Sequence, residues 1–139
     1  MLQRESLADR LYLVLPLVPS VNSMYMTTRY GGRVRTKKAR DWFDEAERIT
    51  KLAIVEQGWQ PTIEEKVVLE IMTYFPDRRK RDVNNSSKAL CDMLEHARVY
   101  DNDRYALPRY IDYAIDREHP RTEVIVRRFK EGDEWKAMN

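Results

Sequence analysis

The stretch TKKARDWFDEAERITKLAIVEQG, residues 36–58, has the apolar spacing of an amphipathic helix. Its apolar residues recur at intervals of three and four: Ala39, Trp42, Phe43, Ala46, Ile49, Leu52, Ala53 and Val55. This spacing places them on one face of a helix, where they can pack against a neighbouring layer. Thr36 is a suitable N-cap and Gly58 a suitable C-terminal stop, so the sequence predicts a long helix between them.

Short apolar runs on either side of this helix predict strands. Residues 11–15 end at Pro16, and residues 67–75 alternate β-branched and aromatic side chains before Pro76. Residues 109–115 and 123–129 predict two further strands joined by a turn near His119 and Pro120. Between the first strand and the helix, the Gly31-Gly32 pair predicts a tight hairpin over residues 25–34.

A second helix is predicted from the apolar positions Ala89, Leu90, Met93, Leu94 and Ala97. The element order is then strand, hairpin, helix, strand, helix, strand, strand. This order indicates an α+β single domain, a mixed β-sheet with two main helices packed on it. The chain has 139 residues, a length typical of one domain. We divide it into a lead-in at residues 1–10, a domain at residues 11–130 and a polar C-terminal tail at residues 131–139.

Composition narrows the class of protein. No run of about 18 apolar residues or basic leader is visible, and the single cysteine, Cys91, cannot form an internal disulfide. We therefore expect a cytoplasmic protein in which Cys91 is a buried thiol. The formal net charge of +2 excludes a uniformly basic nucleic-acid coat protein.

The small net charge conceals separate basic and acidic segments. Residues 29–40 carry six cations and no acid, and residues 76–88 sum to +3, whereas residues 41–75 sum to −5. Local clusters of lysine and arginine determine phosphate binding, so this separation is compatible with one face that meets nucleic acid. The alternative is an ordinary solvated, charged surface.

The stretch FPDRRKRDVNNSSK, residues 75–88, carries the most informative chemistry. Asp82 directly follows four cations, and Asp103 follows the second predicted helix and could fold back toward Asp82. The helix itself is expected to align Asn84, Lys88 and Asp92 on one stripe. Carboxylate and amide oxygens beside a basic rim suit Mg²⁺, which substrate phosphates usually complete. In the alternative reading, Asp82 is only the N-cap of the second helix.

Three motifs resemble the RusA family of Holliday junction resolvases, small endonucleases of phages and prophages. Residues 18–25, VPSVNSMY, keep all but the first proline of the family's Pro-Pro-Ser-x-Asn-x-x-Tyr pattern. The basic run and residues 82–94, DVNNSSKALCDML, resemble Asp-x-Asp-Asn-x-x-Lys followed by a helix with Asp-x-Leu. Residues 99–103, VYDND, resemble Val-Tyr/Trp-x-Asp-Asp. The resemblance covers about residues 11–129.

The resemblance implies a Mg²⁺-dependent homodimer, with Mn²⁺ as a substitute ion, that nicks four-way DNA junctions symmetrically in recombination and repair. Its catalytic residues fall on Asp82, Lys88 and Asp103, and its metal ligands on Asp82, Asn84 and Asp103. We expect no other cofactor and no membrane partner. The predicted DNA-binding residues are Asn22, Arg33, Arg35, Lys37, Lys38, Arg78, Arg79, Lys80 and Arg81.

Two departures from the family pattern leave alternatives open. The second aspartate of the middle motif is Asn84, and the first of the Asp-Asp pair is Asn102. An amide oxygen can bind Mg²⁺ but brings no negative charge, so metal affinity should fall unless Asp101 or a water compensates. The chain could therefore be a non-catalytic protein that binds junctions by shape, or a nuclease that acts on other branched DNA.

Overall fold

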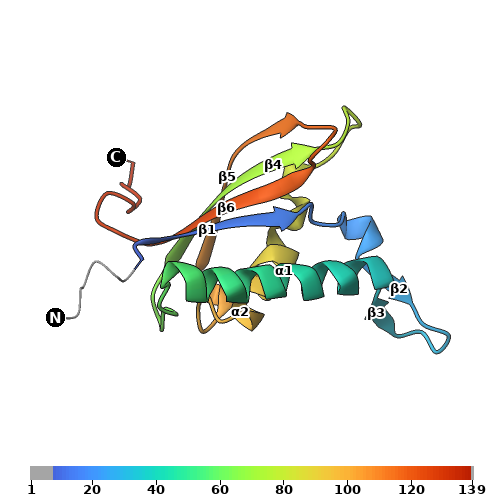
Figure 1. Cartoon of the computed structure of the whole chain (residues 1–139), viewed down its shortest axis with the longest axis horizontal. Coiled ribbons are helices and arrows are strands. Elements are labelled where there is room, and N and C mark those ends of the chain that lie inside the picture. Colours follow the sequence, from blue (N-terminus) through green and yellow to red (C-terminus); the bar gives the residue numbers. More distant parts are fainter. Residues whose placement is uncertain (1–7, 139) are drawn as a thin grey trace.

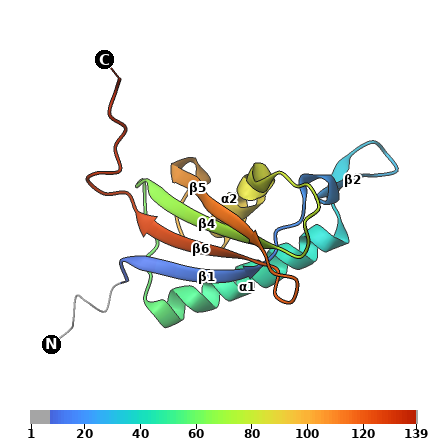
Figure 2. The same cartoon turned by 90° about the horizontal axis from the view of Figure 1, so that it is seen from above.

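The computed structural model describes residues 8–138. Its frame is a four-stranded mixed sheet with both helices on one face (Figures 1 and 2). The strand order is β1-β6-β4-β5, in which β4 and β5 are parallel and the other neighbours antiparallel. The strands are β1 (Arg10–Pro16), β4 (Val67–Phe75), β5 (Ala106–Ile115) and β6 (Arg121–Arg128). The predicted α+β class is confirmed.

The long helix α1 (Lys37–Gln57) begins and ends where the sequence predicts. The Thr36 side chain accepts a hydrogen bond from the Ala39 backbone N–H at 3.2 Å, which satisfies one of the free donors of the first turn. Gly58 has a φ of +73°, the left-handed conformation that ends a helix and that glycine adopts without strain. Local capping thus accounts for both ends.

The core lies between the sheet and the helices. Strand β1 buries alternate leucines and exposes the residues between them, as expected for a sheet covered on one face. Trp42 of α1 and Trp59 are buried, and their indole N–H groups donate to the backbone oxygens of Pro16 and Val99. Cys91 is buried as predicted, and burial raises the pKa of its thiol to about 11.

The second helix, α2 (Ser87–His96), is the crossover between the parallel strands β4 and β5. A separate 3₁₀ turn, η3 (Val83–Ser86), precedes it, and Ser86 occupies the N-cap position. Asp82 therefore caps η3 and not the second helix, which corrects the capping alternative. Asn84 belongs to the tighter 3₁₀ turn, so it does not continue the helical stripe of Lys88 and Asp92.

A two-stranded hairpin, β2 (Tyr25–Thr27) with β3 (Arg33–Arg35), stands away from the sheet beside the start of α1 (Figure 1). It confirms the predicted hairpin, and Gly31 at its tip has a φ of +84°. Tyr30 at the tip is 91% exposed. Both described chain ends lie at the opposite end of the molecule (Figure 1).

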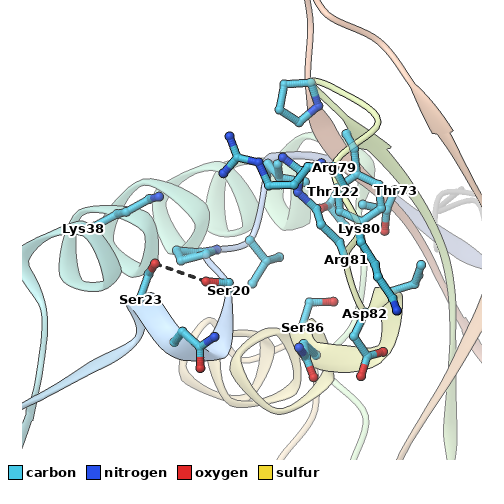
Figure 3. Close-up of a pocket in the computed structure, with 18 residues that line it drawn as sticks. Ser20, Ser23, Lys38, Thr73, Arg79, Lys80, Arg81, Asp82, Ser86 and Thr122 are labelled. Carbon is cyan, nitrogen blue, oxygen red and sulfur yellow. Dashed lines mark hydrogen bonds between the residues drawn. The ribbon is translucent and has the colours of Figure 1, made fainter.

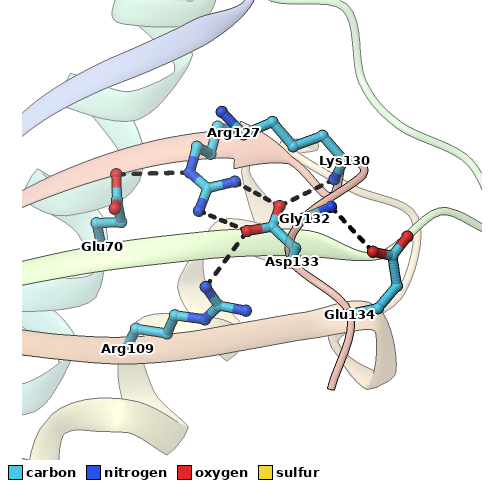
Figure 4. A network of polar contacts seen from close by, with 7 residues as sticks. All are labelled: Glu70, Arg109, Arg127, Lys130, Gly132, Asp133 and Glu134. Carbon is cyan, nitrogen blue, oxygen red and sulfur yellow. Dashed lines mark hydrogen bonds and ion pairs between the residues drawn. The ribbon is translucent and has the colours of Figure 1, made fainter. Parts of the chain in front are cut away.

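The C-terminal tail is held to the sheet through Asp133 (Figure 4). Its carboxylate accepts hydrogen bonds from the Arg127 guanidinium at 2.7 and 3.1 Å and from the Lys130 backbone N–H at 2.9 Å. Arg109 lies 3.5 Å from the same carboxylate. The Arg127 hydrogen bond is the main reason that the pKa of Asp133 lies far below its usual range. In residues 8–138, no helix is long and apolar enough to cross a membrane.

Candidate nucleic-acid interface and metal-binding residues

A cavity of about 590 Å³ lies where β1, α1 and the loop after β4 meet (Figure 3). One wall is the segment after β1, with the 3₁₀ turn η2 (Val21–Ser23). The opposite wall is the loop from Phe75 to Ser86, which contains the basic run and Asp82. The cavity therefore brings together the first two motifs of the sequence, which lie about 60 residues apart in the chain.

Asp77 organises the basic loop. Its carboxylate lies 2.7 Å from the Arg81 guanidinium and 3.9 Å from that of Arg79, and it accepts a hydrogen bond from the Arg79 backbone N–H. The Arg81 hydrogen bond is the main cause of the lowered pKa of Asp77. Neither Arg78 nor Lys80 forms an ion pair within the described chain. These two cations therefore keep their charge available to a polyanion.

The cations of the hairpin and α1 also include some that pair with an acidic side chain and one that does not. Arg35 forms an ion pair with Asp92 of α2 at 2.6 Å and lies 3.8 Å from the centre of the Phe43 ring. Lys37 pairs with Asp41 one turn along α1. Lys38 lines the cavity and has no acidic partner among residues 8–138. In Figure 3 it faces the cavity from α1, on the side opposite Asp82.

Asn22 and its neighbours come from the first motif. The turn η2 places Asn22 on the cavity wall, beside Ser20 and Ser23, whose hydroxyls are hydrogen-bonded at 3.1 Å. Arg33 does not line the cavity; its guanidinium lies 4.7 Å from the centre of the Tyr25 ring, on the hairpin. The cationic surface thus continues from the cavity onto the hairpin.

Asp82 is held by its own turn. One carboxylate oxygen accepts a hydrogen bond from the Asn84 backbone N–H at 3.1 Å, and the side chain remains exposed on the cavity wall. The next turn is fixed by Ser86, whose hydroxyl is 2.7 Å from that of Tyr110 in β5. Burial is the main cause of the raised pKa of Tyr110, and the negative charge of Asp82 adds to it. The bond from Ser86 thus ties the turn that carries Asp82 to β5.

Lys88 lies in the first turn of α2, and Asp103 follows the end of that helix. Asp103 begins the 3₁₀ turn η4 (Asp103–Tyr105), and its backbone N–H donates to the Glu95 carboxylate at 2.7 Å. Glu95 is seven residues after Lys88, so the two side chains share one face of the helix. The charge of Asp103 contributes to the raised pKa of Cys91, which lies between Lys88 and Asp103 in the chain. Helix α2 thus connects the turn of Asp82 with that of Asp103.

The predicted metal ligands do not include three acidic groups. Within residues 8–138, no three His, Cys, Asp or Glu side chains lie close enough together to hold a metal ion. Asp101 accepts hydrogen bonds from the Glu64 backbone N–H, and the Asn102 side chain accepts one from Arg104. Asp101, Asn102 and Asn84 are all exposed. The candidate oxygen donors that the sequence predicts are those of Asp82, Asn84 and Asp103.

The cavity therefore gathers only part of the predicted site. Among the predicted residues it is lined by Asn22, Lys38, Arg79, Lys80, Arg81 and Asp82, but not by Arg33, Arg35, Lys37, Arg78, Asn84, Lys88 or Asp103. Sequence reasoning counted Glu95 among the acids of this region but did not assign it the role that the structure shows, which is to accept the backbone N–H of Asp103. It also missed the cavity floor, formed by Thr73 and Thr122, because strand pairing decides which threonines meet.

Comparison with known proteins gives one consistent result. The family described as Endodeoxyribonuclease RusA matches residues 15–127. A "Crossover junction endodeoxyribonuclease RusA" of Aquifex aeolicus (strain VF5) is 34% identical over 93 residues, which cover 67% of this chain and 70% of the relative. A protein of the same name from Escherichia coli (strain K12) is 31% identical over 104 residues, covering 74% of this chain and 78% of the relative.

Proposed function

Because the chain belongs to the endodeoxyribonuclease RusA family, we propose that it is an endodeoxyribonuclease that resolves four-way DNA junctions. The observation that carries the proposal is the cavity whose lining holds Asp82 together with Lys38 and Lys80, two cations without an acidic partner in the described chain. A carboxylate that shares a cavity with free cations suits a phosphodiester, since the cations neutralise phosphates and the carboxylate contributes to hydrolysis.

We further propose that Asp82, Asn84 and Asp103 bind Mg²⁺, or Mn²⁺ in its place. The donors fit such an ion because all are oxygens, and Mg²⁺ commonly takes one or two carboxylates and completes its shell with substrate phosphates and water. A bound ion would supply Lewis-acid activation of the scissile phosphate and of the attacking water. The exposure of Asp82, Asn84 and Asp103 leaves their oxygens open to solvent and DNA.

The remaining roles fall to the cations. Lys88, exposed in the first turn of α2, would stabilise the negative charge that develops as water attacks phosphorus. Arg78 and Lys80 would hold flanking phosphates, and Lys38 would do so from the other side of the cavity. A four-way junction has two-fold symmetry, so two symmetric nicks call for a homodimer. Light scattering of the free protein tests that state, and a monomer at working concentration would contradict it.

Asn84 favours a second candidate function, a protein that binds junctions by shape without cutting them. It supplies no charge where the family pattern has an aspartate, and the part of the chain that the structure describes holds no trio of acidic ligands. The Asn84→Asp variant tests whether the missing charge at residue 84 limits cleavage. We expect it to raise cleavage or lower the Mg²⁺ concentration required; no change would mean that residue 84 is not a ligand.

One gel experiment separates the candidates. Purified protein is incubated with a labelled four-way junction, a flap or a linear duplex, with Mg²⁺, Mn²⁺ or neither. We expect paired symmetric nicks in the junction that Asp82→Asn abolishes, with binding retained. Asp44→Asn is the matched control, because Asp44 is an exposed carboxylate on α1 outside the cavity. Tight binding without nicking under either ion would favour the binding protein, and equal cleavage of flap or duplex would contradict junction selectivity.

A further inference from the structure

Two buried hydroxyl groups form the floor of the cavity (Figure 3). Thr73 of β4 and Thr122 of β6 are directly opposite each other in the antiparallel pair, and they are 5% and 1% exposed. Neither Oγ1 atom has a hydrogen-bond partner among the residues that the structure describes. A buried hydroxyl without a partner is costly and uncommon in folded proteins. This pair is therefore a place where a hydrogen-bonding group of a ligand would be stabilised.

The lining of the cavity indicates the kind of ligand. Val18 and Pro19 line one side, and Phe75 and Val83 line the loop side, so each wall has an apolar part beside its polar and charged side chains. Cationic side chains also line the cavity, among them Lys38 and Lys80. A volume of about 590 Å³ is within the range of pockets that enclose small ligands, roughly 300–1,000 Å³. Apolar side chains on both walls, hydroxyls on the floor and cations in the lining are together complementary to one nucleotide.

We propose that this cavity receives one unstacked nucleotide of the DNA junction, with the edge of its base against the hydroxyls of Thr73 and Thr122. The inference rests on the proposed function, since it takes a DNA junction as the substrate. Extruding a base costs least where stacking and pairing are already weakened, as at a branch point. A hydroxyl can both donate and accept a hydrogen bond, so the floor can meet either kind of group on a base edge.

Capture of a nucleotide would also select the phosphate that is cut. Asp82 lies on the wall of the same cavity, so a base held on the floor places a neighbouring phosphodiester beside Asp82. Thr73 and Thr122 would then act as specificity residues, through the base, without touching the reacting atoms. Their loss should change where the protein engages the junction more than how tightly it binds, because most of the affinity comes from phosphate contacts.

The test compares nearly isosteric variants. The double variant Thr73→Val/Thr122→Val removes both floor hydroxyls, and Thr62→Val removes a third buried, unpartnered hydroxyl that lies outside the cavity. Both should be at least as stable as the wild type in urea, since no protein hydrogen bond is lost. A third variant, Ser20→Trp, fills the cavity from an exposed wall position. The probes are four-way junctions with 2-aminopurine placed at successive positions around the branch point, because its fluorescence rises on unstacking.

The wild type and Thr62→Val should raise the fluorescence at a defined position beside the branch point. The double variant should bind the junction but lose most of this rise, and its discrimination between bases there should fall about tenfold, the value of a two-bond contact to a base edge. Ser20→Trp should abolish the rise. Binding with no rise at any position, or a rise that survives in both altered proteins, would overturn the inference. Failure of the wild type to bind any junction would instead overturn the proposed function.

Discussion

Replacing Arg35 with alanine should destabilise the fold more than it weakens DNA binding, although Arg35 belongs to the most basic segment of the chain. Its guanidinium pairs with Asp92 at 2.6 Å and lies over the Phe43 ring. The two charged side chains are 35% and 31% exposed, so solvent limits the pair to about 1 kcal/mol. The ring contact adds about 0.5–1 kcal/mol. The expected loss is therefore about 1–2 kcal/mol, or about 5- to 30-fold in the ratio of folded to unfolded protein.

Urea unfolding, followed by the fluorescence of the buried Trp42 and Trp59, measures this loss. Arg29→Ala is the matched control, since Arg29 is an exposed arginine of the same hairpin, and its stability should change by less than about 0.5 kcal/mol. Combining Arg35→Ala with Asp92→Ala should give less than the sum of the single effects, because the two residues share one interaction. If Arg35→Ala keeps wild-type stability and loses as much junction affinity as Arg29→Ala, the anchoring role is refuted.

Three further predictions concern buried groups near the site and the tail. Tyr100→Phe removes the hydroxyl that donates to the Cys91 backbone oxygen at 2.6 Å, and should lower the free energy of unfolding by about 1 kcal/mol; an unchanged urea midpoint would contradict this. The Cys91 thiol, whose pKa burial raises to about 11, should react with a disulfide reagent slowly in the folded protein and rapidly in urea, and rapid native reaction would show that it is not buried. Because Arg127 holds the pKa of Asp133 below its usual range, the ionised carboxylate stabilises the fold above about pH 4 and loses this effect in stronger acid. Asp133→Asn should therefore have a lower urea midpoint than the wild type at neutral pH, with a difference that shrinks below about pH 4; a constant difference would mean that the ion pair is not its source.

The parts of the fold that the sequence predicts well are those determined by neighbouring residues. Helix α1 depends on apolar spacing within one element and on caps within three residues of each end, Thr36 and Gly58. The hairpin depends similarly on Gly31 and its flanking residues. By contrast, the order β1-β6-β4-β5 results from packing between distant segments, and no local pattern in the chain specifies which strands become neighbours.

The same distinction separates the predicted parts of the site from the missed ones. Asp82 is visible in the sequence because it ends a run of charges, whereas the partner of Arg35 lies 57 residues away and belongs to another element. The two floor threonines are neighbours because β4 and β6 pair in this register. A shift of one residue in the pairing would turn one of them to the other face of the sheet. A prediction from composition therefore finds the charged rim of the cavity and misses its neutral floor.

A basic run in a sequence also overstates the charge that reaches a ligand. Of the four consecutive cations before Asp82, Asp77 holds the Arg81 guanidinium at 2.7 Å and lies 3.9 Å from that of Arg79. Arg81 also lies 5.0 Å from the centre of the Phe75 ring, which ties the loop to the end of β4. These contacts give Arg81 a structural part in shaping the loop that carries Asp82. Within residues 8–138, Arg78 and Lys80 are the two cations of this run without an ion pair, so free charge and loop shape, which the sequence presents as one feature, are divided between alternate residues.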